Sequence, residues 1–441
     1  MKILSITAGA AGMYCGSCAR DNALARRLLD LGHDVTLIPV YTPTRTDEPN
    51  VSRPQVLFGG ISVYLQQYLG LFRFAPRFLD RLWDAPSVIG AFAGRMVSND
   101  PRLLGQLTLS MLQGESGVLQ REFRKLLDWI RSEPLPDIIN LPNSLLIALA
   151  EPLRREVRRP VVCTLQGEEL FIQGLIEPYR TQAIELIRRR IPDVDHFIAV
   201  SQYCSTFMME YLGIPASRIS VVPLGINMQG YQRRDTSALP GRPYRIGYFA
   251  RVAPEKGLHV LADAYVRFRR NGGPEARLEA AGYASPAHKP YLDTVKDILK
   301  RAGLQDEFTY HGVVDREGKL AFLRSLDVLS VPATYDEPKG MFLLEAMACG
   351  VPVVQPRRGA FIEIVERTGG GLLVAPDNID GGLAGTFQLL CGSPETALTL
   401  GENGFKKVRV HYSIEVATAR LLDVYEAIVH PALTGTQNSA N

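Results

Sequence analysis

The chain contains 441 residues, of which 22% are charged and 46% hydrophobic, and its formal net charge at pH 7 is +3. This length exceeds the usual size of one domain, so we expect two domains with one core each, and the composition excludes a disordered chain. The small net charge gives no reason to expect nucleic acid as a partner. No apolar run approaches the roughly 18 residues of a membrane-spanning helix.

The N-terminal residues predict a β-α-β unit. Residues 2–7 indicate a buried strand that starts at the second position, so no signal peptide is expected. A loop with glycines follows, then a helix to about residue 31 and a second strand over residues 35–40. The glycines do not form G-x-G-x-x-G, and the second strand does not end in an acid for a ribose. The loop is therefore of a phosphate type, not a dinucleotide-binding one.

Two cysteines, Cys15 and Cys18, stand where this helix is expected to begin. A C-x-x-C pair after a strand can be redox-active, but the tryptophan of thioredoxin motifs is missing and no second pair is present for zinc. The six cysteines are spread along the chain, which favours a reducing compartment. We expect a cytoplasmic protein, and redox or metal use of this pair is the less favoured alternative.

A helix-rich stretch over about residues 63–133 interrupts the alternation of strands and helices. Its segment 72–83 interleaves aromatic residues with arginines. The favoured interpretation is an amphipathic helix whose arginines extend along the packed surface. The alternative is contact with a glycan, a lipid head group or a membrane surface. A second alternative is peripheral contact with the inner membrane face, to which clustered arginines are attracted. Such clusters occur at residues 154–155, 158–159 and 188–190.

The remaining elements continue the same alternation. In the N-terminal half we expect strands at residues 136–140 and 160–165, and Gln166 follows the second of them. A polar, aperiodic stretch over residues 228–242 predicts a linker. The second half again predicts a parallel sheet. Its expected strands are at residues 245–251, 277–282, 308–312, 328–331, 351–354 and 371–374.

Two cations follow the first strand of the second half. Arg251 ends that strand, and Lys256 lies in the turn before the next helix. Both would stand at the carboxyl end of a strand, where doubly wound sheets bind ligands. Arginine offers a planar fork to phosphate, and lysine offers a mobile point charge. The pair therefore predicts a phosphate site.

Residues 335–354 predict a loop, a helix, a turn and a short buried strand. Gly340 precedes the helix and Gly350 terminates it. Glu337 lies just ahead of the helix N-terminus and Glu345 about one turn inside. Free amides at such a terminus attract phosphate oxygens, and carboxylates beside them suit hydroxyl groups. A ligand that is part phosphate and part hydroxyl-rich, such as a sugar nucleotide, fits this arrangement.

These segments resemble retaining glycosyltransferases of the GT-B fold, specifically glycosyltransferase family 4. The spacing of Glu337 and Glu345 is similar to the E-x7-E motif of that family. Arg251 and Lys256 resemble its G-R-x-x-x-x-K-G motif, with Ala250 in place of the first glycine. The resemblance implies an α/β protein of two Rossmann-like, doubly wound parallel-sheet domains that face a cleft.

The resemblance also implies a division of the chain. An N-terminal, acceptor-side domain would carry the helical insertion, and a C-terminal domain would bind the nucleotide sugar. The last helix would cross back to the N-terminal domain. The expected parts are the N-terminal domain at residues 1–227, the linker at 228–242, the C-terminal domain at 243–410, the last helix at 411–431 and a tail at 432–441.

The catalytic residues that the resemblance implies are Glu337, Arg251 and Lys256. Glu337 would face the hydroxyls of the donor sugar and support a cationic transition state. Glu345 would hold the ribose. The two cations, with the amides near Gly340, would neutralise the leaving diphosphate, which is the main electrostatic task when no metal is present.

Other donor-binding residues follow from the same resemblance. Gly16 corresponds to the second glycine of a Gly-Gly pair whose first position is Cys15 here, and its backbone could approach the donor phosphate. Gln166 stands where the family has a histidine facing the donor sugar, and it can still bond a hydroxyl. Val313 follows the strand whose end packs on the nucleotide base. The implied donor-binding set is Gly16, Gln166, Val313, Gly340, Met341, Phe342 and Glu345.

Asp193 and Asp195 match the metal-binding D-x-D pattern of the other glycosyltransferase fold. Their place before a buried strand favours a structural connector between helix and strand. No other cluster of His, Asp or Glu has the spacing of metal ligands. We therefore expect no metal and no cofactor besides the nucleotide-sugar co-substrate.

The implied function is metal-independent transfer of a sugar, with retention, from a nucleotide sugar to a glycan, lipid-linked or small-molecule acceptor. A nucleotide-sugar epimerase of the same fold is one alternative, and it would release no transferred product. A catalytically inactive subunit that binds a partner through the insertion is another. The presence of Glu337, Arg251 and Lys256 argues against an inactive subunit.

Overall fold

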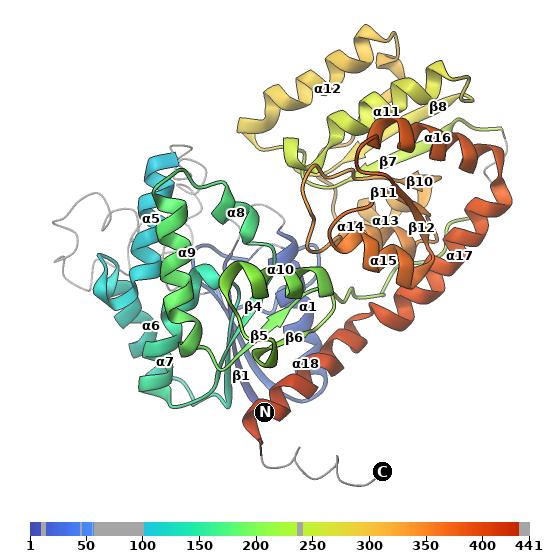
Figure 1. Cartoon of the computed structure of the whole chain (residues 1–441). Helices are drawn as coiled ribbons and strands as arrows, with labels where there is room; N and C mark the ends of the chain where they lie inside the picture. Colours follow the sequence, from blue (N-terminus) through green and yellow to red (C-terminus); the bar gives the residue numbers. More distant parts are fainter. Residues whose placement is uncertain (10–14, 45, 55, 57–100, 236–240, 432–441) are drawn as a thin grey trace. The chain divides into compact units, whose positions relative to one another are not determined.

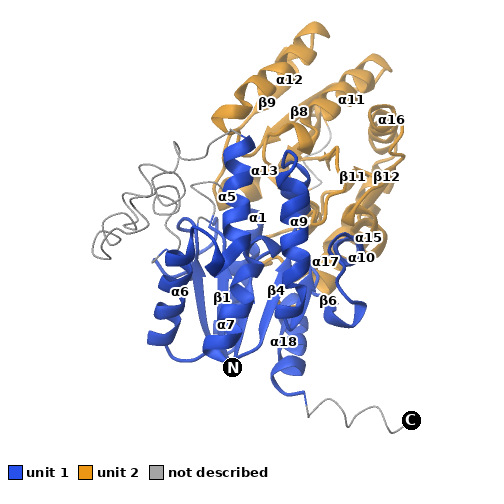
Figure 2. Cartoon of the chain, turned by 60° about the vertical axis from the view of Figure 1, so that its left-hand side comes forward, with its two compact units in different colours: residues 1–225, 417–441 blue, residues 226–416 orange. Residues whose placement is uncertain are grey.

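The computed structural model describes residues 1–9, 15–44, 46–54, 56, 101–235 and 241–431. The larger part of the predicted insertion, with its segment 72–83, and the predicted tail at 432–441 lie outside the described residues. The chain forms two compact units, which Figures 1 and 2 show. Unit 1 comprises residues 1–225 and 417–441, and unit 2 comprises residues 226–416.

Unit 1 is built on a parallel sheet of six strands in the order β2-β1-β3-β4-β5-β6. Strand β1 pairs with β2 on one side and with β3 on the other, so the winding of the chain reverses between β1 and β3. Every residue of β3 and β4 is buried, as expected for strands covered on both faces. The strands are β1 (Lys2–Thr7), β2 (Asp34–Pro39), β3 (Ile138–Leu141), β4 (Val161–Leu165), β5 (His196–Ala199) and β6 (Ile219–Val221).

The helices of unit 1 begin and end at residues that suit those positions. The Ser201 hydroxyl accepts a hydrogen bond from the amide of Cys204 at 3.0 Å and so caps α10, which stops at Gly213 with a φ of +75°. The helices are α1 (Gly16–Asp30), α5 (Pro101–Gln113), α6 (Gln120–Ser132), α7 (Ala150–Val157), α8 (Glu169–Gln173), α9 (Tyr179–Arg190) and α10. Helix α10 spans Gln202–Leu212, and most of α18 (Ile414–Val429) also belongs to this unit.

Unit 2 contains a second parallel sheet of six strands, in the order β12-β11-β10-β7-β8-β9. After β7 the chain builds β8 and β9 on one side and then crosses back to place β10 on the other side of β7. The strands are β7 (Tyr244–Phe249), β8 (Ala276–Ala281), β9 (Phe308–Tyr310), β10 (Val328–Leu329), β11 (Val353–Pro356) and β12 (Gly371–Val374).

The helices of unit 2 alternate with these strands (Figure 2). They are α11 (Leu258–Arg270), α12 (Lys289–Arg301), α13 (Arg316–Ser325), α14 (Met341–Ala348), α15 (Ala360–Thr368), α16 (Ile379–Gly392) and α17 (Pro394–His411). Residues 228–235, from the segment expected to be a linker, pack into this unit, where Tyr231 and Arg234 are each 5% exposed. No helix among the described residues is both long and apolar enough to cross a membrane.

The two helix-flanked parallel sheets confirm the predicted α/β class with two Rossmann-like, doubly wound domains. The bounds of individual strands differ from the sequence expectation by a few residues. Strand β10 spans only Val328–Leu329 and is shorter than the expected 328–331. Strand β11 begins at Val353 instead of residue 351, since the preceding Pro352 has no amide hydrogen to donate.

Candidate functional site

The carboxyl ends of β7 and β10 meet at the point where the winding of unit 2 reverses. In doubly wound sheets this switch point is the usual position of a ligand. The loop after β7 carries Arg251 and Lys256, and the loop after β10 carries Glu337. Two of the three implied catalytic residues, Lys256 and Glu337, come into direct contact there.

Gly257 allows the two loops to approach each other. It adopts a φ of +76°, and a Cβ atom at this position would lie 1.9 Å from the carbonyl oxygen of Pro332. Only glycine fits such a position without displacing backbone. The amide of Thr334 then donates a hydrogen bond to the carbonyl of Glu255 at 2.9 Å. This backbone contact holds Lys256 beside the segment that carries Glu337.

Glu337 is a buried carboxylate, 2% exposed, with three donors around it. Its Oε2 accepts hydrogen bonds from the ammonium of Lys256 and the hydroxyl of Tyr335, and its Oε1 accepts one from the amide of Lys339 at 3.3 Å. The ammonium of Lys256 also donates to the Tyr335 hydroxyl at 2.6 Å. Lys256, Tyr335 and Glu337 thus form one cluster, which we call the switch-point cluster.

The charge of Glu337 results from two opposed effects. Burial is the largest and would raise its pKa, because it disfavours the charged form. The ammonium of Lys256, followed by the hydrogen bonds from Lys256 and Tyr335, outweighs burial and holds the pKa of Glu337 below its usual value. The carboxylate is therefore ionised at neutral pH and neutralises Lys256.

Arg251 lies in the loop after β7, as Lys256 does, but outside the switch-point cluster. Its side chain is 42% exposed and forms an ion pair with Glu255 at 2.6 Å. Its carbonyl oxygen accepts a hydrogen bond from Tyr248 at 2.8 Å, which anchors the backbone. The guanidinium is therefore held on the surface by a partner that a stronger anion could displace.

Helix α14 begins next to the cluster. Gly340 precedes it with a φ of +81°, and Met341 and Phe342 form its first turn, where backbone amides lack helical partners. The Phe342 ring lies 5.9 Å from the ammonium of Lys256. Positive charge from the helix terminus and from Lys256 therefore converges on the same place.

Glu345 lies one turn further along α14 and is 7% exposed. Its Oε1 accepts hydrogen bonds from the ammonium of Lys319 at 2.7 Å and from the hydroxyl of Tyr231 at 3.0 Å. Sequence patterns singled out neither partner, because Lys319 is on α13 and Tyr231 is in the expected linker. Val313, at the carboxyl end of β9, is 48% exposed.

The implied donor-binding residues of unit 1 lie at the carboxyl edge of its own sheet. Gly16 is the first residue of α1, and the preceding residues 10–14 are outside the described part. Cys15 and Cys18 are both unoxidised, and Cys18 is buried. Gln166 follows β4 and is 4% exposed.

Gln166 is held from several directions. Its backbone amide donates to Glu168 at 2.8 Å, and its side-chain amide nitrogen donates to the carbonyl of Pro142 at 3.0 Å and to Asp21 at 3.3 Å. Asp21 also accepts from the hydroxyl of Thr7 at 2.9 Å. Burial, the largest effect, raises the pKa of Asp21 to about 6 despite nearby Arg20. Asp21 was not predicted, because an acid inside a helix carries no motif.

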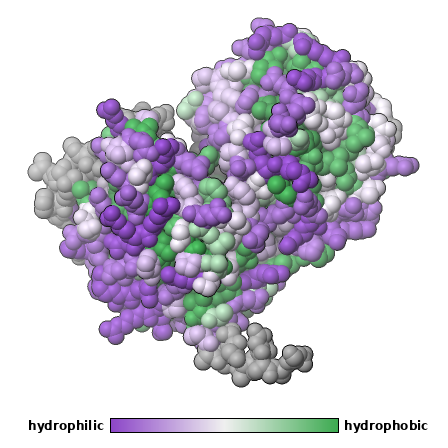
Figure 3. Space-filling model, in the orientation of Figure 1, coloured by the Kyte–Doolittle hydropathy of each residue, from purple (hydrophilic) through white to green (hydrophobic). Residues whose placement is uncertain are grey.

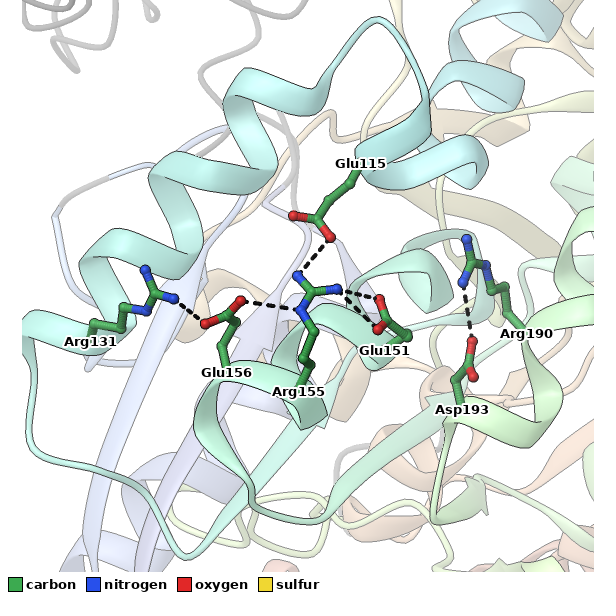
Figure 4. Close-up of polar contacts among 7 residues, drawn as sticks. All are labelled: Glu115, Arg131, Glu151, Arg155, Glu156, Arg190 and Asp193. Carbon is green, nitrogen blue, oxygen red and sulfur yellow. Dashed lines mark hydrogen bonds and ion pairs between the residues drawn. The ribbon is translucent and has the colours of Figure 1, made fainter.

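Asp193 and Asp195 have structural partners. Asp193 forms an ion pair with Arg190 at 3.3 Å, and Asp195 accepts from the amide of Val161 at 2.8 Å. Figure 4 shows the first pair near a surface network centred on Arg155, which contacts Glu115, Glu151 and Glu156. The surface over α6 and α7 is correspondingly hydrophilic in Figure 3. Within the described ranges, no three or more His, Cys, Asp or Glu side chains are arranged to hold a metal.

Two family models match the chain. The one described as "Glycosyltransferase Family 4" matches residues 106–229, which include Gln166. The one described as "Glycosyl transferases group 1" matches residues 232–407, which include the switch-point cluster. The two matches together cover most of the described part of the chain.

The named relatives have low sequence identity to this chain. The chain is 27% identical over 248 residues to MMP alpha-(1->4)-mannosyltransferase of Mycolicibacterium hassiacum, which is 56% of this chain and 57% of that protein. It is 28% identical over 252 residues to GDP-mannose-dependent alpha-(1-6)-phosphatidylinositol monomannoside mannosyltransferase of Mycobacterium tuberculosis, or 54% of this chain and 63% of that protein. The chain therefore spans about three-fifths of the length of these relatives.

Solved structures show the same fold over nearly the whole chain. The crystal structure of Anabaena Alr3699/HepE in complex with UDP has a TM-score of 0.69 and 19% sequence identity, and the match covers 97% of this chain and 100% of that chain. Sucrose-phosphate synthase from Thermosynechococcus elongatus has a TM-score of 0.69 and 18% identity, with 97% and 98% covered.

Proposed function

Because the chain belongs to the GT-B glycosyltransferases of family 4 type, we propose that it transfers a hexose from a nucleotide sugar to an acceptor, with retention and without a metal ion. The observation that carries the proposal is the switch-point cluster, in which Lys256 and Glu337 meet beside the N-terminus of α14. A cation and helix amides suit a diphosphate, and a buried carboxylate suits the sugar that is attached to it.

The reaction breaks the bond between the anomeric carbon and the diphosphate. Positive charge then develops on the sugar ring and negative charge on the leaving group. Lys256, Arg251 and the first-turn amides of α14 would stabilise the leaving diphosphate, and each charged hydrogen bond is worth on the order of 1.5–3 kcal/mol. Glu337 would stabilise the positive sugar. Retention requires the acceptor hydroxyl to attack from the face that the diphosphate leaves, and an oxygen of the departing diphosphate would take the hydroxyl proton.

The ion pairs of Lys256 and Arg251 indicate how binding would begin. Lys256 is neutralised by Glu337, and Arg251 by Glu255, so an arriving diphosphate must compete with both carboxylates. A diphosphate carries more charge than either carboxylate and can take over the cations. Oε1 of Glu345 accepts hydrogen bonds from Lys319 and Tyr231, and Oε2 would accept a hydrogen bond from a ribose hydroxyl.

The names of the relatives support particular classes of donor and acceptor. One relative is named as GDP-mannose-dependent and as acting on a phosphatidylinositol mannoside, and a structural neighbour was solved with UDP. We therefore propose a nucleoside-diphosphate hexose as donor and a glycan or lipid-linked acceptor. A lipid-linked acceptor would bring the protein to the cytoplasmic face of the inner membrane, where we propose peripheral contact.

The test is to incubate the protein in excess EDTA with GDP- and UDP-hexoses, with and without glycan and glycolipid acceptors. We expect one donor to release its nucleoside diphosphate in an acceptor-dependent manner, and NMR of the product should show the anomeric configuration of the donor. An inverted product would refute retention. A donor converted to an isomer without transfer would instead indicate an epimerase. No turnover of any donor would contradict the proposal as a whole.

A further inference from the structure

Glu337 depends on its neighbours to remain ionised. Because it is 2% exposed, water cannot solvate its charge, and a buried carboxylate needs a cation and hydrogen bonds. Lys256 is the cation here, and Tyr335 and the amide of Lys339 are the other donors. The Tyr335 hydroxyl contacts both members of the ion pair, since it accepts from Lys256 at 2.6 Å and donates to Glu337.

The proposed reaction requires Lys256 to serve a second anion. An ammonium has three donors, two of which are directed at Tyr335 and Glu337 here. When Lys256 turns to a diphosphate, part of its attraction to Glu337 is lost. The carboxylate would then take up a proton unless another donor continues to stabilise its charge.

Two aromatic rings lie near the ammonium of Lys256. Its ammonium lies 5.0 Å from the centre of the Tyr335 ring and 5.9 Å from that of Phe342. Both rings can stabilise a cation through their faces. Phe342 belongs to the first turn of α14, where the phosphates are expected, so its ring lies beside the place to which the ammonium would turn.

We propose that Tyr335 is a positioning residue that keeps the carboxylate of Glu337 ionised and oriented while Lys256 binds the diphosphate. The inference rests on the proposed function and adds to it a residue that no sequence motif identified. Tyr335 does not need to touch the substrate for this role. Its hydroxyl donates to Glu337 Oε2 from a position two residues earlier in the same loop, and that bond does not require Lys256.

The inference predicts a specific change in pH dependence. The charged or titratable groups that act on Glu337 are Lys256 from the turn after β7, and Tyr335 and Lys339 from its own loop. The Tyr335 hydrogen bond lowers the pKa of Glu337, so its removal raises that pKa. The rise should be larger in the donor complex than in the free protein, because Lys256 is then engaged with phosphate.

The experiment compares Tyr335→Phe with Tyr291→Phe. The control also removes a half-buried hydroxyl of unit 2. This hydroxyl forms a hydrogen bond with His259 at 2.8 Å and does not belong to the switch-point cluster. For Tyr335→Phe we expect the acid limb of kcat to move up by about one pH unit, so that kcat falls roughly tenfold on the acid side and recovers at pH 8. The Kd for free UDP or GDP at pH 8 should change less than about threefold. The control should keep the wild-type profile.

A second measurement does not depend on turnover. Calorimetric titration with UDP and GDP at pH 6, in two buffers that differ in ionisation enthalpy, counts the protons taken up on binding. We expect uptake to be greater for Tyr335→Phe than for the wild type or Tyr291→Phe. Fluorotyrosine in place of Tyr335 keeps the ring and hydroxyl but is a stronger donor, and it should move the acid limb of kcat to lower pH.

The outcomes separate the inference from the proposed function. If the wild type transfers a sugar but Tyr335→Phe lowers kcat equally at every pH, with unchanged proton uptake, the positioning role is wrong and the transferase remains. The same holds if Tyr335→Phe weakens nucleotide binding as much as it lowers kcat. If the wild type turns over no donor, the proposed function fails and the inference fails with it.

Discussion

Lys256 and Glu337 are 81 residues apart in the chain, yet their side chains form a largely buried ion pair. The pair joins the loop after β7 to the loop after β10. Because the two charges are shielded from water, removing one of them affects the other strongly.

Lys256→Met should therefore destabilise unit 2 in a pH-dependent manner. The lowered pKa of Glu337 contributes stability that is present above its unfolded pKa and is lost as pH falls through the folded value. Without Lys256 burial dominates, and the ionised carboxylate becomes a cost as pH rises. We expect a loss of about 3–5 kcal/mol at pH 8 and much less near pH 4.

Calorimetric unfolding at both pH values measures this difference. The control is the double variant Lys256→Met with Glu337→Gln, which removes both charges and should recover most of the stability at pH 8. Equal destabilisation of the single variant at pH 4 and pH 8 would show that lost packing, not an unpaired charge, is responsible.

Arg251→Ala should weaken nucleotide binding without lowering the stability of the fold. Its ion pair with Glu255 is on the surface, where such pairs contribute at most about 1 kcal/mol, so the melting temperature should hardly change. Loss of one charged hydrogen bond to a diphosphate should raise the Kd for UDP or GDP roughly tenfold. Glu255→Gln, which releases the guanidinium, should leave that Kd unchanged or lower it. Unchanged affinity of Arg251→Ala in titration calorimetry would place this residue outside the site.

Replacing Glu337 should mainly lower kcat, and replacing Glu345 should mainly lower nucleotide affinity. Glu337→Gln should lower kcat more than nucleotide affinity, because its charge acts mainly in the transition state. Glu345→Gln should chiefly weaken nucleotide binding. Replacing the ribose hydroxyls of the nucleotide by hydrogen should weaken binding to the wild type but not further weaken binding to Glu345→Gln. A Glu345→Gln protein that binds nucleotide normally but does not turn over would reverse the two roles.

Asp193→Asn should leave activity in EDTA within about threefold of the wild type, since the residue has a surface partner in Arg190. Arg190→Gln is the matched control and should have a similarly small effect. Loss of activity in EDTA that manganese or magnesium restores would overturn both metal independence and the structural role of this aspartate.

Asp21 should make unit 1 less stable as pH rises. Its folded pKa of about 6 lies above the unfolded value, so its contribution is fully present below the unfolded pKa and is lost as pH rises through about 6. Relative to Asp21→Asn, the wild type should lose roughly 2 kcal/mol of unfolding free energy between pH 4 and pH 7. Trp129 belongs to α6 of unit 1 and the sequence of unit 2 contains no tryptophan, so urea titrations followed by tryptophan fluorescence report on unit 1. A pH-independent difference would contradict the raised pKa.

The sequence alone was sufficient for the fold class, and it singled out Lys256 and Glu337 as candidate site residues, but it did not predict that their side chains form an ion pair. Alternating strands and helices require parallel sheets, and in such sheets the loops after neighbouring strands share one edge. Gly257 and Gly340 mark left-handed turns that can be read locally, since the backbone there suits glycine. These signals depend on residues that are near each other in the chain.

Only the tertiary structure decided which side chains complete these groups. Glu345 meets Lys319 and Tyr231, which is 114 residues away, and Gln166 meets Asp21 across 145 residues. Hydropathy and motif spacing report local conformation and which face of an element is buried, but not the position of a polar side chain on another element. The partners of a buried charge depend on how helices pack over the sheet, so Tyr335, Lys319 and Asp21 could be recognised only once the chain was folded.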